Sequence, residues 1–354
     1  MQLFRTLSAL AVLTLTIIHP SVVLAQTQGK IIDHKLPNDL NGSNFTYPFP
    51  LKLYQFTSQR QQVEMAFMDV APSGKPNHKT AMLFHGNFFC GATWNETIRV
   101  LTHIGYRVIV PDHIGYCKST KPERYQFSLS QLAFNARSLL DTLGIGNVTI
   151  IGHSFGGMLT FRYGLMFPES IDAMIVINAI GLEDYVGKGV PWITIDTNYA
   201  TSLASTFESV QAYENTTYYV GQWEDRYDVW VQMVIDVFYG SQRDTFCWNQ
   251  AQITDVVLTQ PIAHDFGHVR PPVLLIIGEK DTTAIGKTWA PADVVAKLGN
   301  FTALAHDVSA QIPNCTLVTF PELGHAPHIP NPDMFQAVLV EWLTTGKTIS
   351  VGKT

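Results

Sequence analysis

A serine between two glycines, in the run Gly-His-Ser154-Phe-Gly, has the clearest chemical potential in the chain. A serine hydroxyl attacks a carbonyl once a neighbouring base removes its proton. An apolar, β-branched run beginning at Thr149 precedes the motif, and a helix-like run over 158–166 follows it. The glycines permit a strand-to-helix turn too tight for flanking side chains, which lifts the hydroxyl above the sheet edge. The amide of Phe155 would then point toward a developing oxyanion.

Two later strand ends carry the acid and the base that such a serine needs. The apolar run from Pro272 ends in Gly-Glu-Lys-Asp281, and the run from Cys315 ends in Leu-Gly-His325. Parallel strands present their carboxyl ends at one edge of a sheet, so both side chains are expected near Ser154. His325 would accept the serine proton, and Asp281 would hold the imidazole and stabilise its charged form.

Other residues compete for these two roles. Glu183 and Asp184 follow the predicted strand 173–178 and offer another position for the acid. Glu279 lies two residues before Asp281 and should point the other way if the strand continues. His328 and His153 are rivals of His325, although His153 lies inside the turn and suits a structural role. His264 and His268 suggest a metal ligand pair, but no cysteine or carboxylate set completes a site, and no metal or cofactor is expected.

Four motifs together resemble the α/β-hydrolase superfamily, which this order of serine, acid and histidine also fits. They are His85-Gly86, Gly-His-Ser154-Phe-Gly-Gly, Gly-Glu-Lys-Asp281 and Gly-His325, and the resemblance spans roughly residues 52–343. It implies a mostly parallel, doubly wound α/β sheet with a helical cap insertion. Haloalkane dehalogenases and epoxide hydrolases of this superfamily need an aspartate nucleophile where Ser154 stands, so both activities are disfavoured.

The resemblance also places the second oxyanion donor. It should come from the loop after His85-Gly86, through the backbone of Asn87 or Phe88 or the side-chain amide of Asn87, and act with the Phe155 amide. The chain departs from the family at Cys117, where relatives often have a second glycine.

The chain divides into a split core and an insertion. Residues 26–180 and 271–354 carry the strand and helix patterns of one catalytic core, and residues 181–270 interrupt them. The insertion contains many large aromatic residues, including Trp192 and Trp223. Relatives place a helical cap here, so some of these rings are expected to line the substrate pocket, while most pack the cap itself.

The composition agrees with an enzyme that acts on small molecules. The chain has 354 residues, 46% hydrophobic, and a formal net charge of −6, with no basic run. The hydrophobic content is enough for a large core, and the charge argues against a nucleic-acid partner.

The amino terminus has the pattern of a secretory signal. Arg5 precedes an apolar run over 7–18, and Val-Leu-Ala25 offers a cleavage site, so residues 1–25 are expected to be removed. That run is too short to span a membrane, and no span is expected in the mature chain. Acceptor motifs for N-glycosylation favour a eukaryotic secretory route. They begin at Asn41, Asn44, Asn95, Asn147, Asn215, Asn300 and Asn314.

Four cysteines suit an oxidising compartment and allow three complete pairings. Cys90 follows the His85-Gly86 turn, and Cys117 follows the loop that contains Asp112. Both loops should lie at the tops of neighbouring strands, which favours a Cys90–Cys117 disulfide over four free thiols. The sequence leaves the pairing of Cys247 and Cys315 open.

These observations predict a secreted serine hydrolase that cleaves a carboxylic ester or lactone, with a small apolar or aromatic substrate as its partner. Hydrolysis of a carbon–carbon bond or of an aminoacyl amide would use the same three residues. A binding protein that keeps the fold without turnover is the alternative from another class. The sequence does not indicate an oligomeric state.

Overall fold

The structure is a computed structural model that describes residues 29–349. The signal segment expected at 1–25 lies outside the described residues. No helix within 29–349 has both the length and the apolar character needed to cross a membrane.

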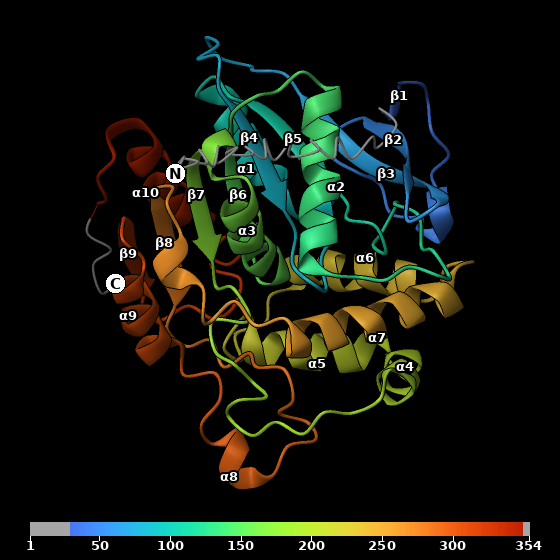
Figure 1. The fold of residues 1–354 in the computed structure, drawn as a ribbon, viewed down its shortest axis with the longest axis vertical. Coiled ribbons are helices and arrows are strands. Elements are labelled where there is room, and N and C mark those ends of the chain that lie inside the picture. Colours follow the sequence, from blue (N-terminus) through green and yellow to red (C-terminus); the bar gives the residue numbers. More distant parts are fainter. Residues whose placement is uncertain (1–28, 350–354) are drawn as a thin grey trace, which may run out of the picture.

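One sheet of nine strands organises the described part of the chain, in the order β1-β2-β3-β5-β4-β6-β7-β8-β9 (Figure 1). The first three strands are antiparallel to their neighbours, and β4 to β9 run parallel. The strands are β1 (Lys30–Ile32), β2 (Leu51–Ser58), β3 (Gln61–Val70), β4 (Thr80–Phe84), β5 (Arg107–Pro111), β6 (Val148–His153), β7 (Ile171–Ile177), β8 (Val273–Gly278) and β9 (Cys315–Phe320).

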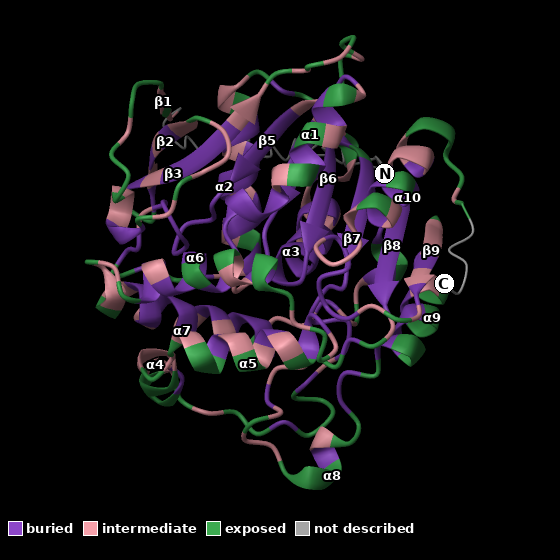
Figure 2. Ribbon diagram, turned by 180° about the vertical axis from the view of Figure 1, so that it is seen from behind, coloured by how far each residue is buried: buried purple, intermediate pink, exposed green. Residues whose placement is uncertain are grey.

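Strand alternation gives the sheet two apolar faces. Met82 and Phe84 of β4 belong to a core cluster with the helices at 129–142, 155–166 and 301–311. Ala81 and Leu83 belong to a second cluster, with the helices at 95–103 and 332–345. Successive side chains of a strand point to opposite faces, so the parallel strands must be apolar throughout. Figure 2 shows these strands buried between helices that expose their outer sides. The mostly parallel, doubly wound architecture predicted from the sequence is confirmed.

The helices of the core follow their sequence signals. Ser128 caps α2 by accepting a hydrogen bond from the Gln131 amide at 3.0 Å, and Gly346 ends α10 in the left-handed conformation. The core helices are α1 (Asn95–His103), α2 (Leu129–Thr142), α3 (Phe155–Met166), α8 (Ala292–Val295), α9 (Phe301–Gln311) and α10 (Pro332–Thr345). Short 3₁₀ helices are η1 (Leu40–Gly42), η2 (Gly91–Trp94), η3 (Pro168–Ser170), η4 (Asp225–Tyr227) and η5 (Phe266–His268).

The chain between β7 and β8 forms four α-helices below the carboxyl ends of the strands in Figure 1. They are α4 (Ile195–Leu203), α5 (Phe207–Thr217), α6 (Asp228–Phe238) and α7 (Arg243–Thr259). We call the segment from α4 to α7 the cap. These four helices lie within the range 181–270.

Amide side chains join α7 and the residue after it to the core. Asn249 donates to the Pro122 carbonyl at 2.9 Å, and Gln250 donates to the Gly115 carbonyl at 3.1 Å. Gln260 accepts from the Leu129 amide at 3.0 Å, at the start of α2. These bonds to backbone groups fix this side of the cap against the segment between β5 and the start of α2.

Candidate active site

Ser154 stands in a strained turn between β6 and α3. Its φ of 56° and ψ of −120° lie in a backbone region that residues other than glycine rarely adopt. The Ser154 amide donates to the Ile177 carbonyl at 3.0 Å, which joins the turn to β7. A Cβ on Gly152 would overlap the Gly156 carbonyl oxygen, and one on Gly156 would overlap that of Phe84. The flanking glycines therefore allow the close approach that the turn requires.

Asp281 and His325 form a buried pair beyond the ends of β8 and β9. Nδ1 of His325 lies 2.7 Å from Oδ2 of Asp281, and both side chains are fully buried. The Thr283 amide donates to Oδ1 of Asp281 at 2.7 Å. The other ring nitrogen, Nε2 of His325, has no hydrogen-bond partner among residues 29–349. The imidazole is therefore oriented by the carboxylate and keeps one nitrogen open for proton exchange.

Asn178 is a site residue that the sequence analysis missed. Its Nδ2 donates to Oδ2 of Asp281 at 2.9 Å and to the Gly278 carbonyl at 3.2 Å, and its Oδ1 accepts from the Gly278 amide at 2.8 Å. The residue directly follows β7 and has a φ of 39°, which asparagine tolerates better than most residues. An asparagine at the carboxyl end of a central strand is the signal that could have indicated it.

Two of the acids that compete with Asp281 pair with other residues. Oε2 of Glu183 is 2.5 Å from Nζ of Lys188, and its Oε1 accepts from the Gly299 amide at 2.8 Å. Asp184 pairs with Nε2 of His264 at 2.9 Å, and the Gly187 amide holds the pKa of Asp184 below its usual value.

The rival histidines surround His325 without replacing it. Nε2 of His153 lies 2.8 Å from the carbonyl oxygen of His325, so this imidazole nitrogen donates and fixes the tautomer. Burial lowers the pKa of His153 well below its usual value. His328 stacks on Trp94 with ring centroids 4.9 Å apart, and burial lowers its pKa to about 3. Both therefore stay neutral near His325.

The amide of His325 contacts the cap. It donates to the Thr217 carbonyl, at the end of α5, with a distance of 3.0 Å. The Tyr218 ring centroid lies 4.7 Å from that of His325. The cap thus touches the backbone and the ring of the predicted base.

The three residues expected to provide oxyanion donors lie at two places. Phe155 begins α3, where the first amides of a helix have no intrahelical acceptor. Asn87 and Phe88 follow β4, and Oδ1 of Asn87 accepts from the Tyr116 hydroxyl at 2.6 Å. This contact turns the carbonyl end of the Asn87 side chain toward Tyr116 and so orients its amide group. Tyr116 is a second residue that the sequence analysis did not single out.

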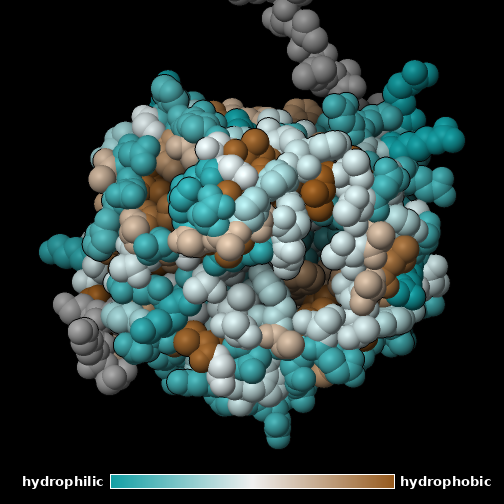
Figure 3. All heavy atoms as spheres, turned by 90° about the horizontal axis from the view of Figure 1, so that it is seen from below, coloured by the Kyte–Doolittle hydropathy of each residue, from teal (hydrophilic) through white to brown (hydrophobic). Residues whose placement is uncertain are grey.

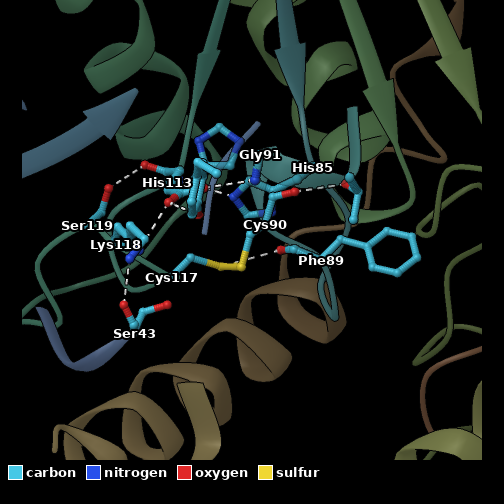
Figure 4. The surroundings of a disulfide bond; sticks show 12 residues. Ser43, His85, Phe89, Cys90, Gly91, His113, Cys117, Lys118 and Ser119 are labelled. Carbon is cyan, nitrogen blue, oxygen red and sulfur yellow. Dashed lines mark hydrogen bonds between the residues drawn. A yellow bond between two sulfur atoms is a disulfide. The ribbon is translucent and has the colours of Figure 1, made fainter. Parts of the chain in front are cut away.

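A disulfide joins Cys90 to Cys117, with Cα atoms 5.8 Å apart (Figure 4). Asp112 connects the same two loops, because its Oδ1 accepts from the Gly91 amide at 2.8 Å and its Oδ2 from the Lys118 amide at 3.0 Å. The loop that carries Asn87 and Phe88 is therefore fixed to the loop after β5.

Cys247 and Cys315 are unpaired. Burial raises the pKa of each thiol to about 11, so both are protonated at neutral pH.

Aromatic rings of the cap differ in what they contact. Tyr213 packs edge-on against Phe88, with centroids 5.6 Å apart, and Tyr218 lies against His325. Trp223 packs inside the cap against Tyr219 and Tyr227. Trp192, with 56% of its surface exposed, donates to Asp255 at 2.8 Å. Tyr213 and Tyr218, rather than the two tryptophans, are thus the rings beside the site residues.

The three predicted catalytic residues lie beneath the surface. Ser154 is 3% exposed, Asp281 1% and His325 0%. Figure 3 shows the face that carries α8 and the cap, with a hollow whose base is apolar.

Comparisons with known proteins identify the family of the chain. The profile of the alpha/beta hydrolase fold family matches residues 82–332. A crystal structure of a probable hydrolytic enzyme from Pseudomonas aeruginosa PAO1 is 46% identical, with a TM-score of 0.84, covering 85% of this chain and 96% of that one. The enol-lactonase from Burkholderia xenovorans LB400 shares the fold at 17% identity and a TM-score of 0.59, covering 80% of this chain and 97% of that one.

A curated relative matches a shorter part. The cis-3-alkyl-4-alkyloxetan-2-one decarboxylase from Xanthomonas campestris pv. campestris is 31% identical over 159 residues, which is 42% of this chain and 50% of that protein. The chain thus spans about half the length of this relative. The family profile covers more than half of the chain, and the chain belongs to the alpha/beta hydrolase fold family.

Proposed function

We propose that the protein is a secreted serine hydrolase that cleaves a carboxylic ester or lactone through an acyl-enzyme on Ser154. One observation carries the proposal: a buried imidazole, held by Asp281 through Nδ1 with its Nε2 open, lies beside the strained turn that presents the serine. The His325 ring is 4.9 Å from the ring of His153, the residue before Ser154.

In each half-reaction of the proposed mechanism, His325 acts first as a base and then as an acid. Nε2 of His325 takes the proton of Ser154 as the serine oxygen attacks the substrate carbonyl. The Phe155 amide, with Asn87 or Phe88, would stabilise the resulting oxyanion. The imidazolium then protonates the leaving alkoxide, and the C–O bond to it breaks. Water repeats the sequence on the acyl-enzyme and releases the acid. Asp281 stabilises the imidazolium and stays ionised.

The surroundings of the site support an apolar or aromatic substrate. Phe88, Tyr213 and Tyr218 form a continuous set of ring contacts that ends on His325. Pockets for small molecules are mostly apolar and aromatic. The curated relative is named for an alkyl oxetanone, which is a four-membered cyclic ester, and this supports including lactones among the candidates. We propose that substrate enters through the hollow in Figure 3.

A substrate panel tests this function. The purified protein would be assayed against p-nitrophenyl esters of graded chain length, an alkyl oxetan-2-one, a larger lactone, an aminoacyl amide and a diketone. We expect turnover of an ester or lactone, with the acid identified by mass spectrometry. Tyr213→Ala should change the ranking of substrates, and Trp192→Ala should leave it unchanged.

The panel also separates the alternatives. Exclusive turnover of the amide or the diketone would replace the ester assignment with one of the other two hydrolytic activities. Carbon dioxide and an alkene from the oxetanone would indicate decarboxylation in place of hydrolysis. No turnover, together with no labelling of Ser154 by a fluorophosphonate, would favour a catalytically silent binding protein.

A further inference from the structure

The carboxyl end of α5 lies directly on the loop that carries His325. The Thr217 carbonyl accepts the His325 amide hydrogen at 3.0 Å, and the Tyr218 ring lies 4.7 Å from the imidazole. Both cap residues are buried. A segment that supplies none of the three proposed catalytic residues thus contacts the base at two points.

Gly324 shows how close this contact is. A Cβ at this position would lie 2.6 Å from the carbonyl oxygens of Thr217 and of Tyr218, and 3.0 Å from the Tyr218 carbonyl carbon. Gly324 has no positive φ, so its backbone conformation does not itself require glycine. These neighbouring atoms are backbone atoms and cannot rotate away as a side chain could. The absent side chain therefore leaves the space that the end of α5 occupies.

His325 is also held from the opposite direction. Nε2 of His153 donates to the His325 carbonyl at 2.8 Å, while the His325 amide donates to the cap. The two backbone polar groups of one residue are thus bonded to β6 and to α5. A residue fixed at both groups has little freedom to move its Cα, so its ring keeps its position against Asp281.

We propose that the carboxyl end of α5, through the Thr217 carbonyl and the Tyr218 ring, is a positioning element for His325. The cap then stays seated on the core during turnover and does not open as a rigid lid. The hydrogen bonds that the side-chain amides of α7 donate to the core also hold the cap in place. The inference rests on the proposed function, because it assigns a role to the contact in that reaction.

Gly324→Ala tests the contact, because the added methyl group must displace the end of α5 or the loop. Gly267→Ala and Gly146→Ala are matched controls, since a Cβ at either position has no atom within 4 Å. With the ester or lactone that the wild type hydrolyses fastest, we expect kcat of Gly324→Ala to fall about 10–100-fold, with KM changed by less than about threefold. Both controls should match the wild type.

A readout independent of turnover separates this inference from the proposed function. The proton on Nδ1 of His325 should give a downfield proton NMR signal in the wild type, and Gly324→Ala should shift or broaden it. Failure of the wild type to turn over any ester or lactone would remove the proposed function, whereas the NMR comparison would still report on the position of His325. A folded Gly324→Ala with wild-type kcat and an unchanged signal would overturn the inference.

A second pair of variants decides the case in which Gly324→Ala does not fold. Tyr218→Ala removes the ring that lies on His325, and Tyr218→Phe keeps it. We expect Tyr218→Phe to retain at least about tenfold more kcat than Tyr218→Ala, together with a sharper Nδ1 signal. Equal kcat values and equal signals in the two variants would overturn the positioning role.

Discussion

Ser154 provides the hydroxyl on which the proposed chemistry depends. Replacing it with alanine should reduce kcat about 10⁴–10⁶-fold while leaving the thermal unfolding midpoint nearly unchanged. Ser309→Ala in α9 is the matched control, because within residues 29–349 the Ser309 hydroxyl bonds only to a carbonyl of its own helix. Steady-state kinetics and circular dichroism would measure both effects. Turnover by pure Ser154→Ala at the wild-type rate would remove the nucleophile from this position.

Asn178 offers a second test at this scale. Asn178→Ala removes the donor to Asp281 and leaves the Gly278 amide without its partner. We expect the free energy of unfolding to fall by about 1–3 kcal/mol and kcat to fall about tenfold, because Asp281 then holds His325 less firmly. Denaturant titration and kinetics would measure these changes, with the exposed Asn38→Ala as control. A loss of stability with unchanged kcat would restrict Asn178 to a structural role.

The sequence suggested the three proposed catalytic residues but not the residues that support them, for a physical reason. Ser154, Asp281 and His325 each follow an apolar strand, and strand ends can be read from local pattern. The hydrogen bond from Asn178 to Asp281 joins residues 103 apart in sequence. The Thr217 group that accepts the His325 amide hydrogen is a backbone carbonyl, which every residue possesses. The place of Asn178 at a strand end is a local signal for the residue, but neither contact partner is close in sequence, so the contacts themselves could not be predicted.

At the scale of elements, the Cys90–Cys117 disulfide should stabilise the fold and the loop that carries Asn87 and Phe88. Its cysteines are separated by 27 positions, and closing a loop of that length contributes about 3–4 kcal/mol by chain entropy. The double variant Cys90→Ala/Cys117→Ala should therefore lose stability, and its kcat should fall more than its KM rises, since the donors near Asn87 loosen. Cys315→Ala is the control. Full alkylation of both thiols in unreduced wild type would show that the bond does not form.

Helix α5 should also make stability depend on pH. Glu214 is fully buried, neither of its carboxylate oxygens has a partner among residues 29–349, and burial raises its pKa to about 8. Between its ordinary value of 4.5 and about 8 the folded protein holds a proton that the unfolded chain has lost. The stability associated with this proton is complete below pH 4.5 and disappears as pH rises through 8.

Glu214→Gln removes this titration. The variant should become more stable than the wild type as pH rises, by about 2–5 kcal/mol at pH 8. Urea unfolding at pH 5, 7 and 9 would measure the difference, and Glu208→Gln, exposed in the same helix, is the control. Parallel pH profiles for wild type and Glu214→Gln would mean that Glu214 finds a partner or water on folding.

At the scale of the whole molecule, the repeated strand and helix patterns predicted the order of the core. The strand predicted at 173–178 is β7, and the apolar runs that begin at Pro272 and Cys315 form β8 and β9. The short strand β1 was not predicted, because three residues are too few for a periodic signal. The arrangement of α4 to α7 was not predicted either, since helix packing in the cap depends on contacts with distant loops.

Secretion and glycosylation remain predictions about the whole chain. Expressed in a eukaryotic host, the protein should appear in the medium, begin near Gln26 and lose mass on treatment with a glycosidase. Among the acceptor residues, Asn44, Asn147, Asn300 and Asn314 are exposed, whereas Asn41, Asn95 and Asn215 are partly buried. We expect the exposed group to carry most of the sugar, as measured by peptide mapping. An intracellular product that keeps residues 1–25 and shows no mass shift would contradict both expectations.

The missing side chain at Gly324 has a consequence for how this protein can diversify. Because the carbonyls of Thr217 and Tyr218 fill that space, the cap and the histidine loop are not independent modules. A cap grafted from another member of the family would have to bring the same backbone path at the end of α5, or it would displace the loop. Substrate range is therefore easier to alter by exchanging side chains such as Tyr213 within the resident cap than by recombining whole caps.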